Sequence, residues 1–148
     1  MSTNPERAVS YVLNKSVTSY MDKDVLLLGL NTQTREAARM LRHYETDDII
    51  VTDENNLPVG IVTDEDILSS VSDVTVYAEA TTLKDVMTTP LITINEKSTL
   101  QDALHKMRDN NIRKLPVLSK KNQVVGMIFQ SVIANVIREA TATAPRLL

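Results

Sequence analysis

Apolar and polar positions follow the same pattern twice along this 148-residue chain. Each repeat begins with a short apolar run, Val25–Leu28 or Leu91–Ile94, which predicts a strand. A polar turn follows, in which Thr or Ser residues at 31–34 and 96–99 are expected to cap a helix. Apolar residues then recur at spacings of three and four, which indicates an amphipathic helix. The two apolar faces consist of Ala37, Leu41 and Tyr44, and of Leu100, Ala103, Leu104 and Met107.

The second half of each repeat predicts a hairpin and a closing helix. Asp and Asn residues suit the tight turn at 53–56, and Ser119–Asn122 takes its place in the second repeat. The strands on either side of these turns are predicted at Ile49–Thr52 and Val59–Thr63, and at Leu115–Leu118 and Val124–Phe129. The closing helices are predicted at Glu65–Val71 and from Ser131 to about Ala140. The order is therefore strand–helix–strand–strand–helix in each repeat.

A shift of 66 residues aligns the two repeats without a gap from Met21 to Leu68. Identical residues meet at several positions, among them Met21 and Met87, Val51 and Val117, and Gly60 and Gly126. A register held over that length indicates an internal duplication.

The duplication predicts an α+β fold in which two pseudo-symmetric β-α-β-β-α repeats pack sheet to sheet, because one repeat has too little core to be stable alone. The expected divisions are a helical N-terminal extension at 1–16, repeat 1 at 17–71, a linker at 72–82, repeat 2 at 83–140 and a frayed tail at 141–148. Within the extension, a helix at 5–16 is expected to pack on the pair of repeats.

Composition removes several classes of function. The chain has no cysteine, which excludes disulfides, thiolate metal sites and cysteine nucleophiles. The net charge of −3 gives no overall attraction to nucleic acid or to an anionic membrane. We see no leader peptide and no apolar run long enough to span a membrane, so we expect a soluble, cytoplasmic protein. His43 and His105, the only histidines, occupy non-equivalent repeat positions and suggest no metal or catalytic site.

The ordered motifs of both repeats resemble the CBS (cystathionine beta-synthase) domain. In repeat 1 they are Ser19-Tyr20-Met21, Glu36-Ala37, Ile49-Ile50-Val51-Thr52-Asp53 and Gly60-Ile61-Val62-Thr63-Asp64-Glu65-Asp66. In repeat 2 they are Asp85-Val86-Met87-Thr88-Thr89-Pro90, Asp102-Ala103, Ile112-Arg113-Lys114-Leu115-Pro116-Val117 and Gly126-Met127-Ile128. The resemblance covers about residues 17–137. It implies a paired module that binds an adenosine ligand between the repeats, regulates another activity and often forms a dimer.

The resemblance implies one intact ligand site. In the family motif Gly-x-x-Thr-x-x-Asp, the Asp binds the ribose hydroxyls and the Thr contacts ribose or phosphate. Repeat 1 has both residues, Thr63 and Asp66, whereas repeat 2 has Phe129 and Val132 at the equivalent positions. A carboxylate can accept hydrogen bonds from two neighbouring hydroxyls, which neither Phe nor Val can do.

Charges before the hairpin of each repeat favour the same site. The resemblance implies that Arg113 and Lys114 of repeat 2 reach phosphates bound at the repeat 1 site. Asp47 and Asp48 take their place in repeat 1 and would repel phosphate at the repeat 2 site. The adenine is expected between Asp24-Val25-Leu26 and Thr46-Asp47-Asp48, with Ile50 and Ile61 as apolar wall.

The preferred interpretation is therefore a non-enzymatic sensor of AMP, ADP or ATP that needs no cofactor, forms a homodimer and signals through that dimer or an unknown regulated protein. Several alternatives stay open. Asp66 can simply cap the helix that follows Thr63, and Arg113 and Lys114 can be a solvated pair. The module can equally be a ligand-free dimerisation scaffold. S-adenosylmethionine or nucleic acid is a less favoured ligand, and no nucleophile or catalytic base indicates an enzyme.

Overall fold

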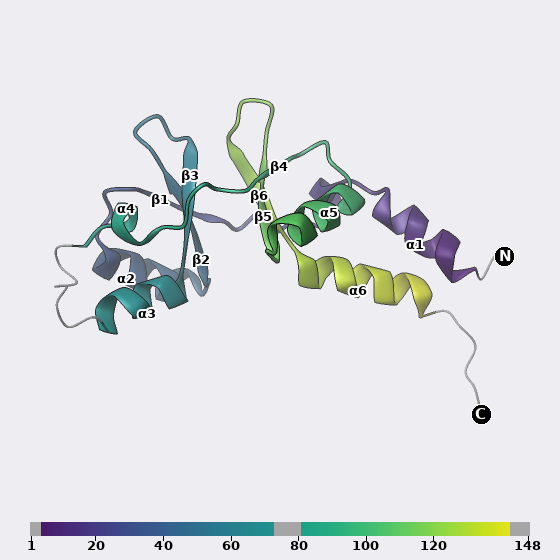
Figure 1. Cartoon of the computed structure of the whole chain (residues 1–148), viewed down its shortest axis with the longest axis horizontal. Helices are drawn as coiled ribbons and strands as arrows, with labels where there is room; N and C mark the ends of the chain where they lie inside the picture. Colours follow the sequence, from purple (N-terminus) through teal and green to yellow (C-terminus); the bar gives the residue numbers. More distant parts are fainter. Residues whose placement is uncertain (1–3, 73–80, 143–148) are drawn as a thin grey trace. The chain divides into compact units, whose positions relative to one another are not determined.

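The computed structural model describes residues 4–72 and 81–142 (Figure 1). The chain divides into two compact units that do not follow the order of the sequence. Unit 1 combines Met1–Lys23 with Thr93–Leu148, and unit 2 comprises Asp24–Ile92. The segment that begins repeat 1 therefore folds with repeat 2, and the segment that begins repeat 2 folds with repeat 1. The predicted tail at 143–148 and most of the predicted linker lie outside the described residues.

Unit 2 contains a three-stranded sheet in the order β1-β2-β3. The strands β1 and β2 are parallel, and β2 and β3 form an antiparallel hairpin. Its elements are β1 (Leu26–Gly29), α2 (Thr34–Tyr44), β2 (Asp48–Thr52), β3 (Pro58–Thr63), α3 (Asp64–Ser72) and the short α4 (Leu83–Val86).

Unit 1 repeats this topology with the sheet order β4-β5-β6. It contains α1 (Pro5–Leu13), a short 3-10 helix (Val17–Ser19), β4 (Ile94–Asn95), α5 (Leu100–Asn110), β5 (Lys114–Leu118), β6 (Val124–Phe129) and α6 (Gln130–Thr141). The helix α1 packs against α6 and α5, so the predicted N-terminal helix is present and covers the helices of unit 1 (Figure 1).

The predicted α+β class and the repeated β-α-β-β-α order are confirmed. Two local expectations are wrong. The strand predicted at Leu91–Ile94 is only the two-residue β4, which starts at Ile94. The helix α2 begins after Gln33 without any side-chain cap, whereas Thr99 caps α5 through the predicted turn. Two short elements, α4 and the 3-10 helix, were not expected from the sequence.

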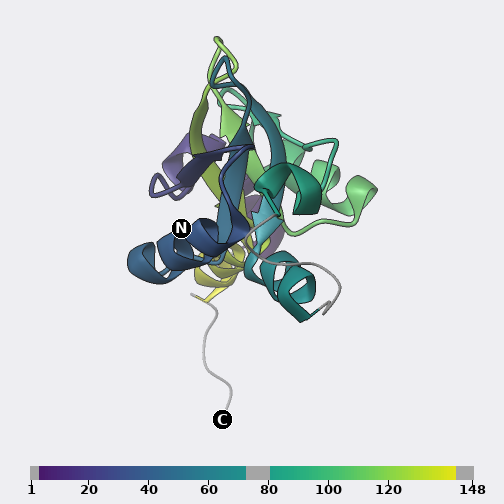
Figure 2. The ribbon, with the colours of Figure 1, turned by 90° about the vertical axis from the view of Figure 1, so that its left-hand side faces the viewer.

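The core of unit 2 lies between its sheet and its two long helices. Figures 1 and 2 show α2 and α3 beside the sheet. The buried cluster draws on α2, α3, the short α4 and two strands, and consists of Ala37, Leu41, Ile49, Val51, Val62, Ile67 and Leu83. Tyr44, which was expected on the apolar face of α2, is 57% exposed and meets the ring of His43 edge-on. It is the last residue of α2.

Short exchanged segments complete both sheets. In unit 1, the Asp22 amide donates to the Met127 carbonyl and the Met127 amide to the Asp22 carbonyl, each over 2.8 Å. In unit 2, Thr88 and Ile61 exchange the equivalent pair of bonds over 2.9 and 3.2 Å. Each segment also seats a methionine against a strand glycine, Met21 on Gly126 and Met87 on Gly60.

These glycines leave no room for a side chain. A Cβ on Gly60 would lie 2.6 Å from the Met87 Sδ, and one on Gly126 would lie 2.5 Å from the Met21 Sδ. At Gly126 it would also lie 2.9 Å from the Asp22 carbonyl oxygen, which is backbone and cannot rotate away.

We therefore predict that Gly126→Ala lowers the free energy of unfolding by about 1–3 kcal/mol because of overpacking. We expect a smaller loss for Gly60→Ala, because only the flexible Met87 side chain must move. Gly29→Ala is the matched control, since its Cβ would meet nothing within 4 Å. Urea denaturation measures all three, and a Gly126→Ala protein as stable as Gly29→Ala would contradict the prediction.

Candidate functional site

One end of the unit 2 sheet gathers most of the residues that the sequence analysis singled out. Leu26 pairs with Ile49 in the parallel register, which places Asp24 and Val25 beside the start of β2. Asp48 pairs with Thr63 in the antiparallel register, at the start of β2 and the end of β3. The segments 24–26, 46–48 and 63–66 therefore meet at the same edge.

Thr63 and Asp66 form a reciprocal cap at the start of α3. The Thr63 amide donates to Oδ2 of Asp66 over 2.8 Å, and the Asp66 amide donates to Oγ1 of Thr63 over 3.3 Å. This arrangement is a capping box, which satisfies two backbone amides at once. The expected alternative, that Asp66 caps the helix, is thus part of the structure, and the cap holds both side chains half-buried at the sheet edge.

A backbone hydrogen bond fixes the position of α3 against β2. The Asp64 amide donates to the Asp47 carbonyl over 3.1 Å. Four carboxylate residues consequently lie near the cap, at Asp47, Asp48, Asp64 and Glu65. This end of unit 2 is strongly acidic.

Alternation along the strands separates the remaining predicted residues. Ile50 pairs with Ile61 and lies on the same side of the sheet as Asp48 and Thr63, so these four side chains share one face. Leu26 instead packs against the helix-facing core. The structure therefore places Ile50 and Ile61 with Thr63, and directs the Leu26 side chain away from them.

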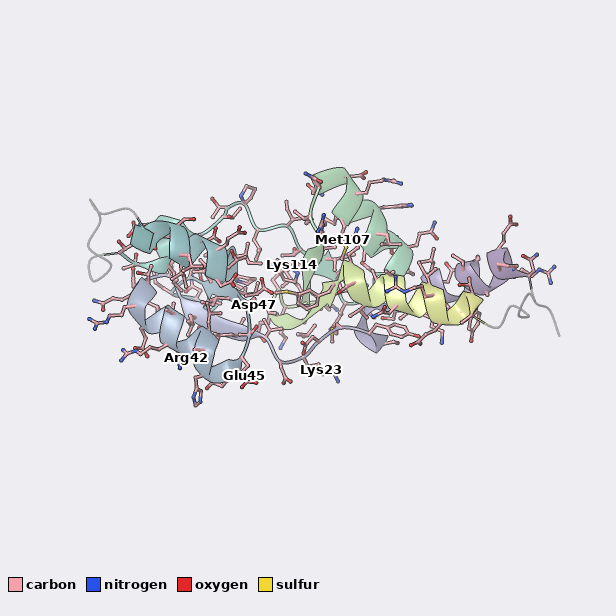
Figure 3. The ribbon with its side chains drawn as sticks, turned by 90° about the horizontal axis from the view of Figure 1, so that it is seen from below. Lys23, Arg42, Glu45, Asp47, Met107 and Lys114 are labelled. Atoms are coloured by element: carbon pink, nitrogen blue, oxygen red, sulfur yellow. The ribbon has the colours of Figure 1, made fainter. Side chains whose placement is uncertain are left out.

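A surface groove lies between α2 and α3, and the sequence analysis did not foresee it. Its volume is about 480 Å³, and it is lined by Ala38, Leu41, Arg42, Glu45, Thr46, Asp47, Asp64, Ile67 and Leu68. Thr46 and Asp47 are thus groove residues, whereas Thr63 and Asp66 are not. Figure 3 labels Arg42 and Glu45 on the end of α2, and Asp47 just beyond that helix. Leu68, which lines the groove, is 66% exposed, and this exposure is not visible in the sequence.

Arg113 and Lys114 occupy the equivalent corner of unit 1. The Gln130 amide donates to the Arg113 carbonyl over 2.8 Å, as Asp64 does to Asp47, and Lys114 pairs with Phe129 at the strand edge. Phe129 is the N-cap of α6 and provides no side-chain cap. The hydrogen-bonding pair of repeat 1 is therefore missing from repeat 2, as the sequence indicated.

The chain is thus a duplicated α+β module in which the polar cap after the hairpin, Thr63 with Asp66, is present in unit 2 and has no counterpart at Phe129 and Val132 of unit 1. Among residues 4–72 and 81–142, no group of three or more His, Asp or Glu side chains is arranged to hold a metal ion. No helix in the same ranges is both long enough and apolar enough to cross a membrane.

The chain belongs to the CBS domain family, whose model matches residues 17–73 and 83–139. A curated relative, the homoserine O-acetyltransferase of Methanosphaera stadtmanae, is 27% identical over 132 residues, which cover 86% of this chain and 26% of that protein. The uncharacterized protein MK0525 of Methanopyrus kandleri is 27% identical over 82% of this chain and 62% of its own length. The chain therefore spans only part of these relatives.

Solved structures of CBS domain pairs have the same fold. The CBS domain pair of protein MJ0100, in complex with 5-methylthioadenosine and S-adenosyl-L-methionine, superposes with a TM-score of 0.72 at 25% identity. That match covers 84% of this chain and 97% of the MJ0100 chain. The CBS-pair protein CBSX2 from Arabidopsis thaliana superposes with a TM-score of 0.72 at 18% identity, over 88% of this chain and 99% of CBSX2.

The capping box should stabilise the folded protein whether or not a ligand binds. Thr63→Ala removes the acceptor for the Asp66 amide and should lower the free energy of unfolding by about 1 kcal/mol. Thr63→Ser keeps the hydroxyl and should stay close to the original protein. Urea denaturation of both variants tests the cap, and equal losses for Ala and Ser would show that the hydroxyl does not stabilise α3.

Proposed function

We propose that this chain is a regulatory, non-enzymatic module that binds one adenine nucleotide, AMP, ADP or ATP, at the Thr63–Asp66 corner of unit 2. The proposal rests on the hydrogen bonding of the Asp66 carboxylate. Its Oδ2 accepts the Thr63 amide, while no hydrogen bond to Oδ1 is present among the described residues. A half-buried carboxylate held by a helix cap, with one oxygen still available, suits the hydroxyls of a ribose.

Apolar and polar neighbours complete the proposed pocket for the nucleoside. Ile50 and Ile61 share the sheet face of Thr63, and Asp24, Val25, Thr46, Asp47 and Asp48 lie at the same sheet edge. These side chains would surround the adenine ring, and Leu26 would contact it through its backbone. In this proposal Thr63 contacts ribose or phosphate through its hydroxyl, and Arg113 and Lys114 bind the phosphates.

The ligands of similar proteins support an adenosine compound. The MJ0100 pair binds 5-methylthioadenosine and S-adenosyl-L-methionine, and CBSX2 has been crystallised with AMP. The acidic residues around the corner favour a ligand with few phosphate groups, because they repel each added negative charge. S-adenosyl-L-methionine, which carries a positive sulfonium, is therefore the ligand to compare first with AMP.

A ligand-free scaffold is the second candidate function. It is favoured by the same capping box, because Asp66 already has a structural role without any ligand. In that case the paired repeats would serve only to hold two protein molecules together. Titration with ligands separates the two functions, since a scaffold binds none of them.

Isothermal titration calorimetry with AMP, ADP, ATP, adenosine and S-adenosyl-L-methionine is the first test, and we expect saturable binding of one molecule per chain. Asp66→Ala should weaken that binding by about 1–3 kcal/mol through the lost hydrogen bonds. The matched control is Asp102→Ala, because Asp102 forms the same capping box with Thr99 at the start of α5. Absence of binding by the whole panel at millimolar ligand, or equal weakening by both variants, would refute the proposal.

A second test isolates the phosphate contact. Arg113→Ala should weaken the binding of AMP by about 1–3 kcal/mol, because a charge-assisted hydrogen bond to phosphate is lost. The affinity for adenosine, which has no phosphate, should stay unchanged. Arg108→Ala is the control, because Arg108 is exposed near Asp109, at 3.6 Å. Equal losses of affinity for AMP and for adenosine would show that Arg113 does not bind the phosphate.

A further inference from the structure

Two methionines at equivalent positions of the repeat hold the exchanged segments against the sheets. Met21 lies against Gly126 in unit 1, and Met87 lies against Gly60 in unit 2. Each sulfur takes the space in which a side chain on the glycine would begin, at 2.5 and 2.6 Å from a Cβ placed there. Both glycines are buried. On this side of each thioether, therefore, no room remains between the sulfur and the strand.

Each methionine is followed directly by the residue that closes the β-bridge. Asp22 exchanges two backbone hydrogen bonds with Met127 of β6, and Thr88 exchanges two with Ile61 of β3. Within residues 4–72 and 81–142, these are the only bridges that join the two segments to those strands. The end of each segment is thus fixed on its outer strand by one bridge and by the methionine beside it.

Three methionines of the described part of the chain are partly accessible to small solutes. Met21 and Met87 are half-buried, as is Met40 on α2, whereas Met107 and Met127 are buried. Met40 belongs to neither bridge. Because the chain has no cysteine, methionine is its most readily oxidised side chain. Exposure decides which thioethers react first, so the three half-buried residues should oxidise before the two buried ones.

Oxidation changes both the size and the polarity of a thioether. Hydrogen peroxide transfers one oxygen atom to the sulfur: the O–O bond breaks, an S–O bond forms, the sulfur loses two electrons and water leaves. The product is a sulfoxide, which is bulkier than the thioether and has an oxygen that accepts hydrogen bonds. Beside a buried glycine, that oxygen either overpacks the strand or turns to water and draws the sulfur off the glycine.

We propose that Met21 and Met87 are oxidation sites, and that conversion of either residue to the sulfoxide by a peroxide loosens its segment from the adjoining strand. The effect stays within the unit that carries the modified residue, because each methionine and its glycine belong to the same unit. Enzymatic reduction of the sulfoxide restores the contact, so the change is reversible. This inference goes beyond the proposed function and does not depend on nucleotide binding.

Peroxide treatment of the folded protein, followed by peptide mass spectrometry and a thermal melt, is the first test. We expect one added oxygen atom at Met21 and at Met87 while Met107 and Met127 stay reduced. The Tm should fall by about 5 °C per modified site. Methionine sulfoxide reductases should restore the original Tm. A protein oxidised at both sites that melts like the untreated protein would overturn the proposal, as would resistance of both sulfurs to peroxide in the folded state.

Leucine variants assign the effect to individual sulfurs, because leucine has nearly the volume of methionine and cannot form a sulfoxide. Each variant is compared with its own untreated sample. The double variant Met21→Leu with Met87→Leu should lose almost no stability on oxidation. Met40→Leu is the matched control, since it removes a half-buried methionine outside the bridges, and it should lose as much as the original protein. Equal losses in the double variant and in the original protein would place the sensitive residue elsewhere and refute the proposal.

Hydrogen exchange followed by NMR locates the change within each unit. In oxidised Met21→Leu protein, the two bridge amides of unit 2, those of Thr88 and Ile61, should exchange about tenfold faster than before treatment. In oxidised Met87→Leu protein, the two bridge amides of unit 1 should respond in the same way. Unchanged exchange at the bridge beside an oxidised methionine, or equal acceleration in both units of a single variant, would contradict the proposed mechanism.

Discussion

Each unit depends on a β-bridge to the segment that begins the other repeat. Asp22 and Met127 close it in unit 1, and Thr88 and Ile61 close it in unit 2, each through a pair of backbone hydrogen bonds. A three-stranded sheet with two helices is at the lower limit of a stable core. The added segment supplies buried Val17 to unit 1 and buried Leu83 to unit 2. Neither repeat is complete without residues from the start of the other.

The two glycines follow directly from this exchange. A methionine sulfur lies against each strand at the place where a Cβ would be, so glycine is required by contact with the segment and not by an unusual backbone angle. Gly60 and Gly126 are also aligned by the sequence repeat. The repeat therefore preserves the backbone contact, although the polar residues around it have diverged.

The sequence was sufficient to predict the fold class and the element order. Of the predicted site residues, Asp24, Val25, Thr46, Asp47, Asp48, Thr63 and Asp66 lie at one edge of the unit 2 sheet. The success of the sequence came from continuous apolar runs such as Val124–Phe129 and from helical spacing in Leu100, Ala103 and Met107, which are local patterns set by burial. It failed where tertiary contacts decide the conformation. The short β4, the uncapped start of α2 and the helix α4 are fixed by neighbouring segments, and Thr81 and Thr32 carbonyls accept the Thr34 and Leu83 amides there.

The candidate site shows a further limit of sequence reasoning. The motif around Thr63 and Asp66 predicts either a ligand contact or a helix cap. The structure has the cap, and the other carboxylate oxygen of Asp66 accepts no hydrogen bond from the part of the chain that is described. The two roles are compatible, because a cap uses one side of the carboxylate and fixes the direction of the other. In repeat 2, the same position is Val132 and α6 begins without a side-chain cap. Loss of the polar pair there removes the cap and, with it, the contact proposed for a ligand.

Divergence between the repeats has also separated their charges. Equivalent positions of the two repeats now carry opposite charges, as at Asp47 and Arg113. The Asp47 carbonyl accepts the Asp64 amide at the corner that holds Thr63 and Asp66. A carboxylate at this position repels a phosphate, whereas the guanidinium at the equivalent position of the other repeat attracts one. The same fold therefore presents two electrostatically different corners, and the difference comes from substitutions that leave the backbone hydrogen bond between strand and helix unchanged.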